Sequence, residues 1–135
     1  MKRLLEIDDE YDFSLLGISC HAKDYRLCWE LNRTLNLQLA KYKSIKSALK
    51  PDEKFSTSIF DDEENLLEYT LISNKNNGKY LIPEYPQLDY FLKLSGPQHD
   101  FEIKEQKQKV QSLDLVLTVL QINPTSLKSG PNLVF

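Results

Sequence analysis

Apolar and polar residues alternate along several short segments of this chain with the two-residue period of a β-strand. The clearest case is Leu66–Ser73, in which Leu67, Tyr69 and Leu71 share one face. An acidic turn precedes this segment and an Asn-Gly turn follows it, and turns of these kinds join neighbouring antiparallel strands in a meander. The same reasoning predicts strands at Lys2–Ile7, Phe13–Cys20, Phe55–Phe60, Leu66–Ser73, Lys79–Ile82, Leu88–Leu94 and Leu113–Ile122.

One segment has the period of an amphipathic helix. Between Ala22 and about Asn36, three leucines recur on one stripe while charged residues occupy most of the remaining surface. Asp24 lies near the start of this segment, where a negative charge suits the positive end of the helix dipole. The pattern therefore predicts a helix that packs on the sheet through Leu27, Leu31 and Leu35.

A second helix is predicted at Asp100–Gln111, although the segment is polar. The next segment, Leu113–Ile122, is rich in β-branched residues and predicts a last strand. Its pattern also allows the helix to continue through Leu120, so both interpretations stay open. The second helix would be anchored by few apolar residues: Phe101, Ile103 and Val110.

Two further segments have little periodic pattern. Lys41–Lys54 is rich in lysine and predicts a mobile basic connection, with one helical turn around Ile45–Leu49. A short extended stretch ending near Tyr42 leads into it. From about residue 123 to Phe135 the sequence predicts a short irregular tail.

These elements predict an α+β fold, with a single sheet of five to seven mostly antiparallel strands and two helices packed on one face. A length of 135 residues corresponds to one domain, 1–135. The chain is long enough to bury a core without help from a disulfide or a metal ion.

Composition and charge disfavour several classes of partner. The chain has 17 basic and 20 acidic residues, whereas a nucleic-acid-binding domain usually presents a basic face. No apolar run has the length of a membrane span. Glu6 and Asp8 interrupt the apolar start of the chain, which argues against a secretion signal. We therefore expect a cytoplasmic protein with no membrane partner.

The cysteines and histidines predict neither a disulfide nor a metal site. Cys20 and Cys28 lie in apolar segments and are expected to be reduced thiols that pack as small apolar groups. Together with His21 and His99, they fall short of a zinc site. We expect no metal ion and no cofactor.

The most specific stretch is a corner between two apolar runs. Pro83 and Pro86 each fix their own φ and push the preceding residue towards extended geometry. The stretch resembles the motif of the IPExxxVDY family of bacterial proteins, with Ile82–Glu84 and Leu88–Tyr90 at the specified positions and leucine in place of valine. This resemblance implies no reaction, cofactor or catalytic residue. A second segment is similar to the same family at Ser19, Asp24, Tyr25, Leu27, Leu31 and Asn32.

The carboxylates of the corner, Glu84 and Asp89, have a structural and a catalytic interpretation. Either can accept backbone amide hydrogen bonds and fix the corner, and either could pair with Arg26 or Arg33. Two carboxylates with opposed pKa shifts could also serve as acid and base, but nothing in the sequence indicates such shifts. The structural role is favoured.

The strand after the corner has a predicted register. Leu88, Tyr90 and Leu92 share one face, which we expect to meet the core. Asp89 and Lys93 fall on the other face and are expected to point away from it.

Aromatic residues give the best indication of function. Tyr25 and Trp29 lie beside the leucine stripe, and tyrosine and tryptophan are common anchors of protein interfaces. Without a catalytic constellation, the sequence favours a non-enzymatic module whose partner is another protein; a homodimer is an alternative. The candidate binding residues are Tyr25, Arg26, Trp29, Glu84, Tyr85, Asp89 and Tyr90.

The competing hypothesis is a small enzyme or a small-molecule-binding protein. Cys20 and His21 suggest a thiol–imidazole pair, but adjacent residues of a strand point to opposite faces and no third, orienting residue can be placed. We therefore assign no catalytic residue. A cleft would need the turn before the helix to lie beside the corner, bringing together His21, Asp24, Arg26 and Glu84.

Overall fold

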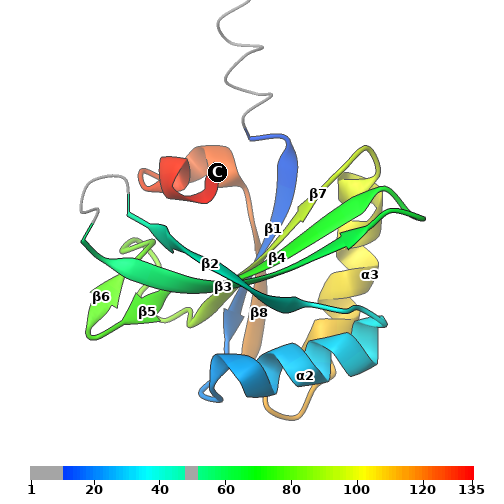
Figure 1. Ribbon diagram of the computed structural model, residues 1–135, viewed down its shortest axis with the longest axis horizontal. Coiled ribbons are helices and arrows are strands. Elements are labelled where there is room, and N and C mark those ends of the chain that lie inside the picture. The colour runs from blue at the N-terminus through cyan, green and yellow to red at the C-terminus, as the bar shows by residue number, and fades with distance from the viewer. Residues whose placement is uncertain (1–10, 48–51) are drawn as a thin grey trace, which may run out of the picture.

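The computed structural model describes residues 11–47 and 52–135. These residues form an α+β fold whose main sheet has six antiparallel strands in the order β2-β3-β4-β7-β1-β8 (Figure 1). The predicted fold class and range of strand number are confirmed, and the acidic turn joins two paired strands, β3 and β4, as predicted. The predicted pairing of Leu66–Ser73 with Lys79–Ile82 is wrong, because β4 pairs next with β7 and the Asn-Gly turn joins Lys75–Asn76 to Lys79–Tyr80 in a separate two-stranded sheet. The six strands are β1 (Phe13–Ser19), β2 (Ala40–Lys46), β3 (Lys54–Asp62), β4 (Leu67–Ser73), β7 (Tyr90–Ser95) and β8 (Thr118–Ile122).

Two helices, α2 (Asp24–Leu35) and α3 (His99–Gln111), cover one face of this sheet (Figure 1). The predicted stripe of Leu27, Leu31 and Leu35 is buried beneath α2. These leucines share a core with the residues of β1, β4 and β7 that point to the same side. The leucine stripe of α2 therefore packs on the sheet, as the sequence pattern predicted.

The second helix is anchored differently from the prediction. Ile103 and Val110 are buried, but Phe101 is 77 % exposed, and the third inward-facing residue is the polar Gln106. After α3 the chain turns and forms β8, which begins at Thr118 and pairs with β1. This pairing excludes the alternative in which the helix continues through Leu120.

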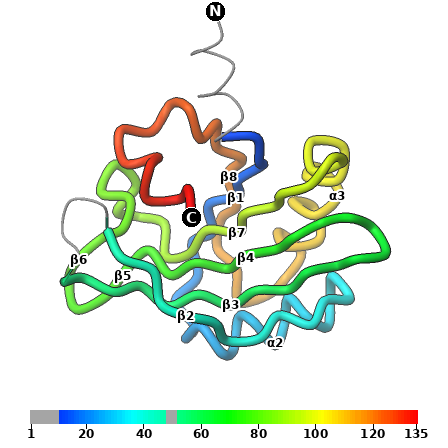
Figure 2. The backbone as a smooth tube through the Cα atoms, turned by 45° about the horizontal axis from the view of Figure 1, so that its top comes forward, coloured from blue at the N-terminus to red at the C-terminus, as the bar shows by residue number. Residues whose placement is uncertain are grey.

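Two segments without long helices cover the opposite face of the sheet (Figure 2). One is the corner, which follows a two-stranded ribbon of β5 (Lys75–Asn76) and β6 (Lys79–Tyr80). The other is the C-terminal tail, which was predicted to be irregular but contains η1 (Pro124–Ser126) and η2 (Gly130–Leu133). The second core consists of Phe13, Leu15, Phe55, Ile72, Leu81, Ile82, Leu88, Phe91, Ile122, Leu127 and Leu133.

The predicted register of the strand after the corner was wrong in part. The strand begins at Tyr90, and Leu88 packs in the second core instead of beside Tyr90 and Leu92. Lys93, expected to point away from a core, is buried. The prediction assumed that one face of this strand met solvent, whereas β7 is a central strand with a core on each side.

The lysine-rich connection was also mispredicted. β2 runs through it and pairs with β3 at one edge of the sheet, with an irregularity between Tyr42 and Ile45. The prediction of a mobile connection is therefore wrong for Lys41–Lys46, and the prediction of a helical turn is wrong at Ile45. Residues 48–51 and the predicted strand Lys2–Ile7 lie outside the described residues. An edge strand that is largely exposed shows no apolar alternation, so its pattern gave no strand signal.

Candidate functional site

The proline corner is organised by Asn74, which is fully buried. Its Nδ2 donates to the carbonyl oxygens of Tyr85 and Leu88 at 3.0 and 2.8 Å, and its Oδ1 accepts from the amide of Ile82 at 2.7 Å. Its backbone N–H donates to the carbonyl of Asp89. One side chain therefore satisfies three backbone groups of the corner. Sequence reasoning missed this role because it treated Asn74 only as a turn residue.

Glu84 and Tyr85 connect the corner to the tail and the core. The carboxylate of Glu84 accepts from the backbone N–H of Ser129 at 2.8 Å and from its hydroxyl at 2.7 Å. Partial burial opposes ionisation of Glu84, but the hydrogen bonds from Ser129 outweigh it and lower the pKa of this carboxyl. Tyr85 is half-buried against the second core. Both residues, which were predicted to bind a partner, therefore make contacts that stabilise the fold.

Asp89 and Tyr90 hold the turn that leads into α2. Asp89 Oδ2 accepts from the backbone N–H of Cys20 at 2.8 Å, and its Oδ1 lies 2.7 Å from Lys75 Nζ. The Tyr90 hydroxyl donates to the carbonyl of Ala22 at 2.6 Å. The carboxylates of the corner do accept backbone amides, as predicted, but these amides belong to distant segments.

The four residues of the hypothetical cleft do not come together. His21 lines a shallow cavity that also contains Lys75 and Asp89, and Arg26 lines a different one. Glu84 is held by the tail, which belongs to the opposite face of the sheet. The cleft hypothesis therefore has no common site for these groups.

The two cysteines are free thiols. Burial is the main cause that raises the pKa of both thiols, and it outweighs hydrogen bonds at Ala22 and Ser58, which act in the opposite direction. A raised pKa disfavours the nucleophilic thiolate at neutral pH. The neighbours Cys20 and His21 therefore do not form an activated pair.

Tyr25 and Trp29, in contrast, are available at the surface. They are 70 % and 60 % exposed, and the guanidinium of Arg33 lies 5.5 Å from the centroid of the Trp29 ring. Both aromatic residues line a hollow of about 410 Å³ between α2 and the edge of the sheet. We call it the aromatic groove; its lining residues are Asp24, Tyr25, Cys28, Trp29, Asn32, Leu39, Lys41 and Ser58.

Hydrogen bonds fix both ends of the aromatic groove. At one end, Asn32 bonds to both backbone groups of Leu39, just before β2. At the other end, Asp24 Oδ2 accepts from the Ser56 hydroxyl at 3.0 Å and lies 3.6 Å from Lys41 Nζ. These contacts therefore hold α2 and the edge of the sheet in place on either side of the groove.

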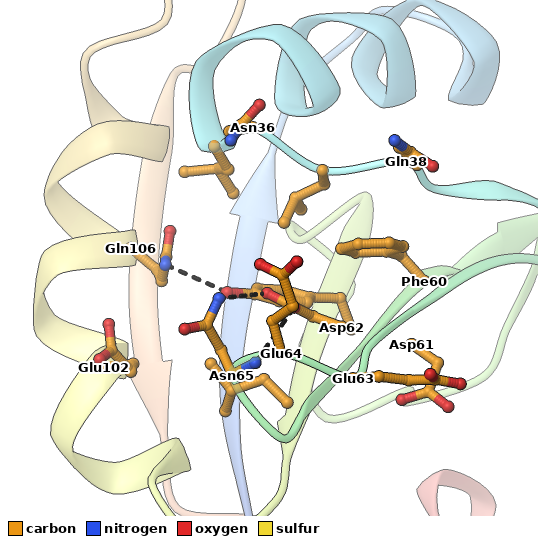
Figure 3. Close-up of a pocket in the computed structure, with 14 residues that line it drawn as sticks. Asn36, Gln38, Phe60, Asp61, Asp62, Glu63, Glu64, Asn65, Glu102 and Gln106 are labelled. Atoms are coloured by element: carbon orange, nitrogen blue, oxygen red, sulfur yellow. Dashed lines mark hydrogen bonds between the residues drawn. The ribbon is translucent and has the colours of Figure 1, made fainter.

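A second hollow, of about 510 Å³, lies between the end of α2, the β3–β4 turn and α3 (Figure 3). In Figure 3, Gln106 extends from α3 towards the turn that carries Asp62 and Asn65. No basic residue is among its described lining residues. We call it the acidic cavity; its carboxylates are those of Asp61, Asp62, Glu63, Glu64 and Glu102.

Polar groups at the inner wall of the acidic cavity are incompletely paired. Gln106 Nε2 donates to the Tyr69 hydroxyl at 3.2 Å, but Gln106 Oε1 is buried and has no hydrogen-bond partner in the described part of the chain. Burial, followed by the charges of Asp62, Glu102 and Glu105, raises the pKa of Tyr69 to about 12. The carboxylates of the turn and of α3 therefore both act on this wall.

Among residues 11–47 and 52–135, no group of three or more His, Cys, Asp or Glu side chains is placed to hold a metal ion. No helix in this described part is long and apolar enough to cross a membrane. No protein-family model matches the chain, and no curated protein matches it. The resemblance to the IPExxxVDY family stays a prediction from the motif.

Proposed function

We propose that this protein is a non-enzymatic binding module that docks an acidic, extended segment of another protein along edge strand β2 and the aromatic groove. The observation that carries the proposal is the exposure of Tyr25 and Trp29 beside a groove with hydrogen-bonded ends. Such aromatic residues are frequent interface anchors, and an open sheet edge can accept a further strand. We propose a cytoplasmic location, which the two free cysteines support.

Charge favours an acidic partner. Between Lys23 and Lys46 the chain has six basic and two acidic residues, although its net charge is −3. Three of these basic residues, Lys41, Lys43 and Lys46, are exposed on edge strand β2, where they attract an acidic segment and repel a basic one. The lysines of β2 also oppose the pairing of β2 with the same strand of a second copy. A different protein is therefore favoured over a homodimer.

Trp29 lines the aromatic groove and is the single tryptophan of the sequence, so tryptophan fluorescence reports on binding at the groove. We would select peptides from a random display library on the wild-type protein and titrate the selected peptides while recording tryptophan emission. We expect peptides rich in Asp and Glu, and a blue shift as the peptide covers the exposed indole. Their affinity should fall with added salt, since the attraction is partly between exposed charges.

Matched variants inside and outside the aromatic groove show whether the selected peptides bind at this site. Tyr25→Ser and Lys43→Glu should each weaken binding of the selected peptides, whereas Phe101→Ser removes an equally exposed aromatic residue outside the groove and should have no effect. Selection of peptides without acidic enrichment, or peptides that bind Tyr25→Ser and Phe101→Ser equally well, would refute the proposal.

A further inference from the structure

We propose that the acidic cavity binds a small linear polyamine, an aliphatic chain with two or more protonated amino groups. This site is separate from the aromatic groove. It is formed by the end of α2, the β3–β4 turn and α3, and it shares no lining residue with the groove. The proposal is thus independent of the proposed function.

The charge of the cavity indicates a cationic ligand. Its five carboxylates come from two walls: four from the end of β3 and the turn that follows it, and one, Glu102, from α3. Within the described part of the chain, none of the five forms an ion pair. A bound cation would balance part of this negative charge.

A second, independent observation concerns Gln106, which is 6 % exposed and lines the cavity. Its Oε1 is the one buried side-chain polar atom without a partner among the described residues. Most buried polar groups are hydrogen-bonded, so an unpaired acceptor calls for a donor. An ammonium group has three N–H donors and no acceptor, which suits this oxygen and the carboxylates that line the same cavity.

The other lining residues narrow the class of cation. No group of three acidic side chains in the described residues is placed around one metal ion. Leu35, Leu37, Leu67 and the part-buried Phe60 provide apolar surface between the charged walls. A polyamine combines ammonium groups with methylene groups that such surface can cover. A hollow of about 510 Å³ also has the size of a small-molecule pocket.

The direct test is calorimetric titration of the full chain with putrescine and spermidine in low-salt buffer, with butylamine and Mg²⁺ as matched ligands. Butylamine has the same carbon chain as putrescine but one amino group. We expect putrescine to bind at least about tenfold more tightly than butylamine, because the second ammonium reaches the second wall. The side-chain amide signal of Gln106 should shift in NMR spectra, and Trp29 emission should not change.

Variants locate the binding. Gln106→Met removes the unpaired oxygen, and Glu102→Gln removes a half-buried charge without emptying space; each should weaken putrescine binding at least about tenfold. Asp114→Asn removes an acidic charge outside the cavity and should leave the affinity unchanged. If Gln106→Met fails to fold, the affinity of Glu102→Gln for putrescine still tests the proposal.

Three results would overturn the proposal. The first is no heat and no Gln106 shift at millimolar polyamine. The second is affinity that Glu102→Gln leaves unchanged, which would place binding elsewhere. The third is an equal Gln106 shift with Mg²⁺ or butylamine, which would indicate a metal site or a site for a single cation.

Discussion

Asn32 and Leu39 are joined by two hydrogen bonds that satisfy both backbone groups of Leu39. The Leu39 N–H donates to Asn32 Oδ1 at 2.8 Å, and Asn32 Nδ2 donates to the Leu39 carbonyl at 3.1 Å. Between them the chain leaves the helix at Asn36, which adopts a left-handed conformation with φ 57°. The pair therefore closes the α2–β2 connection and sets one end of the aromatic groove.

Asn32→Ala should lower the free energy of unfolding by about 1–3 kcal/mol, because the N–H of the buried Leu39 loses its acceptor. The Leu39 carbonyl also loses the Asn32 donor and keeps only the Cys28 thiol, whose Sγ lies 3.7 Å away. Urea unfolding measures the change. Thr34→Ala, on the same helix, controls for the effect of alanine on helix propensity. Equal midpoints for Asn32→Ala and the wild type would show that water replaces both bonds and that the pair does not fix the groove.

The corner should depend on Asn74 more than on any proline. Asn74→Asp keeps the acceptor for the Ile82 amide but turns the donor to Tyr85 and Leu88 into a buried carboxylate facing two carbonyls. We expect a loss of at least about 3 kcal/mol in unfolding free energy. Asn77→Asp makes the same change in the exposed turn nearby and should be close to neutral. Similar melting temperatures for the two variants would contradict this account of the corner.

Much of the fold could be predicted because its signals are local. The leucine stripe of α2 and the alternation of β4 each repeat within a few residues. Edge strand β2 gave no such signal, because its side chains meet solvent on both sides and need no apolar period.

The candidate sites depended on contacts between distant segments, which no local pattern encodes. Glu84 binds Ser129 and Asp89 binds Cys20, so residues that looked like binding candidates are occupied within the fold. In the sequence, Gln106 is one of many polar residues in a polar helix, and only the structure shows that it lines the acidic cavity. Tyr25 and Trp29 were predicted correctly to lie beside the buried stripe, but only the structure gave their exposure.

The contact between Glu84 and Ser129 should make the docking of the tail sensitive to acid. The pKa of Glu84 is lowered from 4.5 in the folded protein, so its hydrogen bonds contribute stability above that value. As the pH falls through the lower, folded-state pKa, the carboxylate is protonated and this contribution is lost. Hydrogen exchange of the Ser129 amide should therefore accelerate in acid relative to other tail amides.

Glu84→Gln is the matched variant, because glutamine keeps an acceptor oxygen but does not titrate in this range. Its difference in Ser129 protection from the wild type should be present at neutral pH and should shrink well below pH 4.5. A difference that stays constant with pH would mean that the charge of Glu84 has no part in holding the tail.

The buried amine of Lys93 should add a second pH dependence of stability, at alkaline pH. Lys93 Nζ donates to the Leu133 carbonyl at 2.7 Å and lies 4.5 Å from the ring centroids of Phe13 and Phe135. Burial lowers the pKa of this amine from 10.5, and the charge of Glu68 opposes the shift only in part. Between the folded pKa and 10.5, the unfolded chain binds one proton more than the folded protein.

Stability must therefore rise with pH in that interval through Lys93, by up to about 1.4 kcal/mol per pH unit. Tyrosines titrate in the same range, so the quantity to measure is the difference in unfolding free energy between the wild type and Lys93→Met. We expect this difference to shift in favour of the wild type from neutral pH towards 10.5. Parallel curves for Lys93→Met and the wild type would show that the amine has the same pKa in the folded and the unfolded chain. The Leu133 carbonyl and the two rings would then compensate fully for its burial.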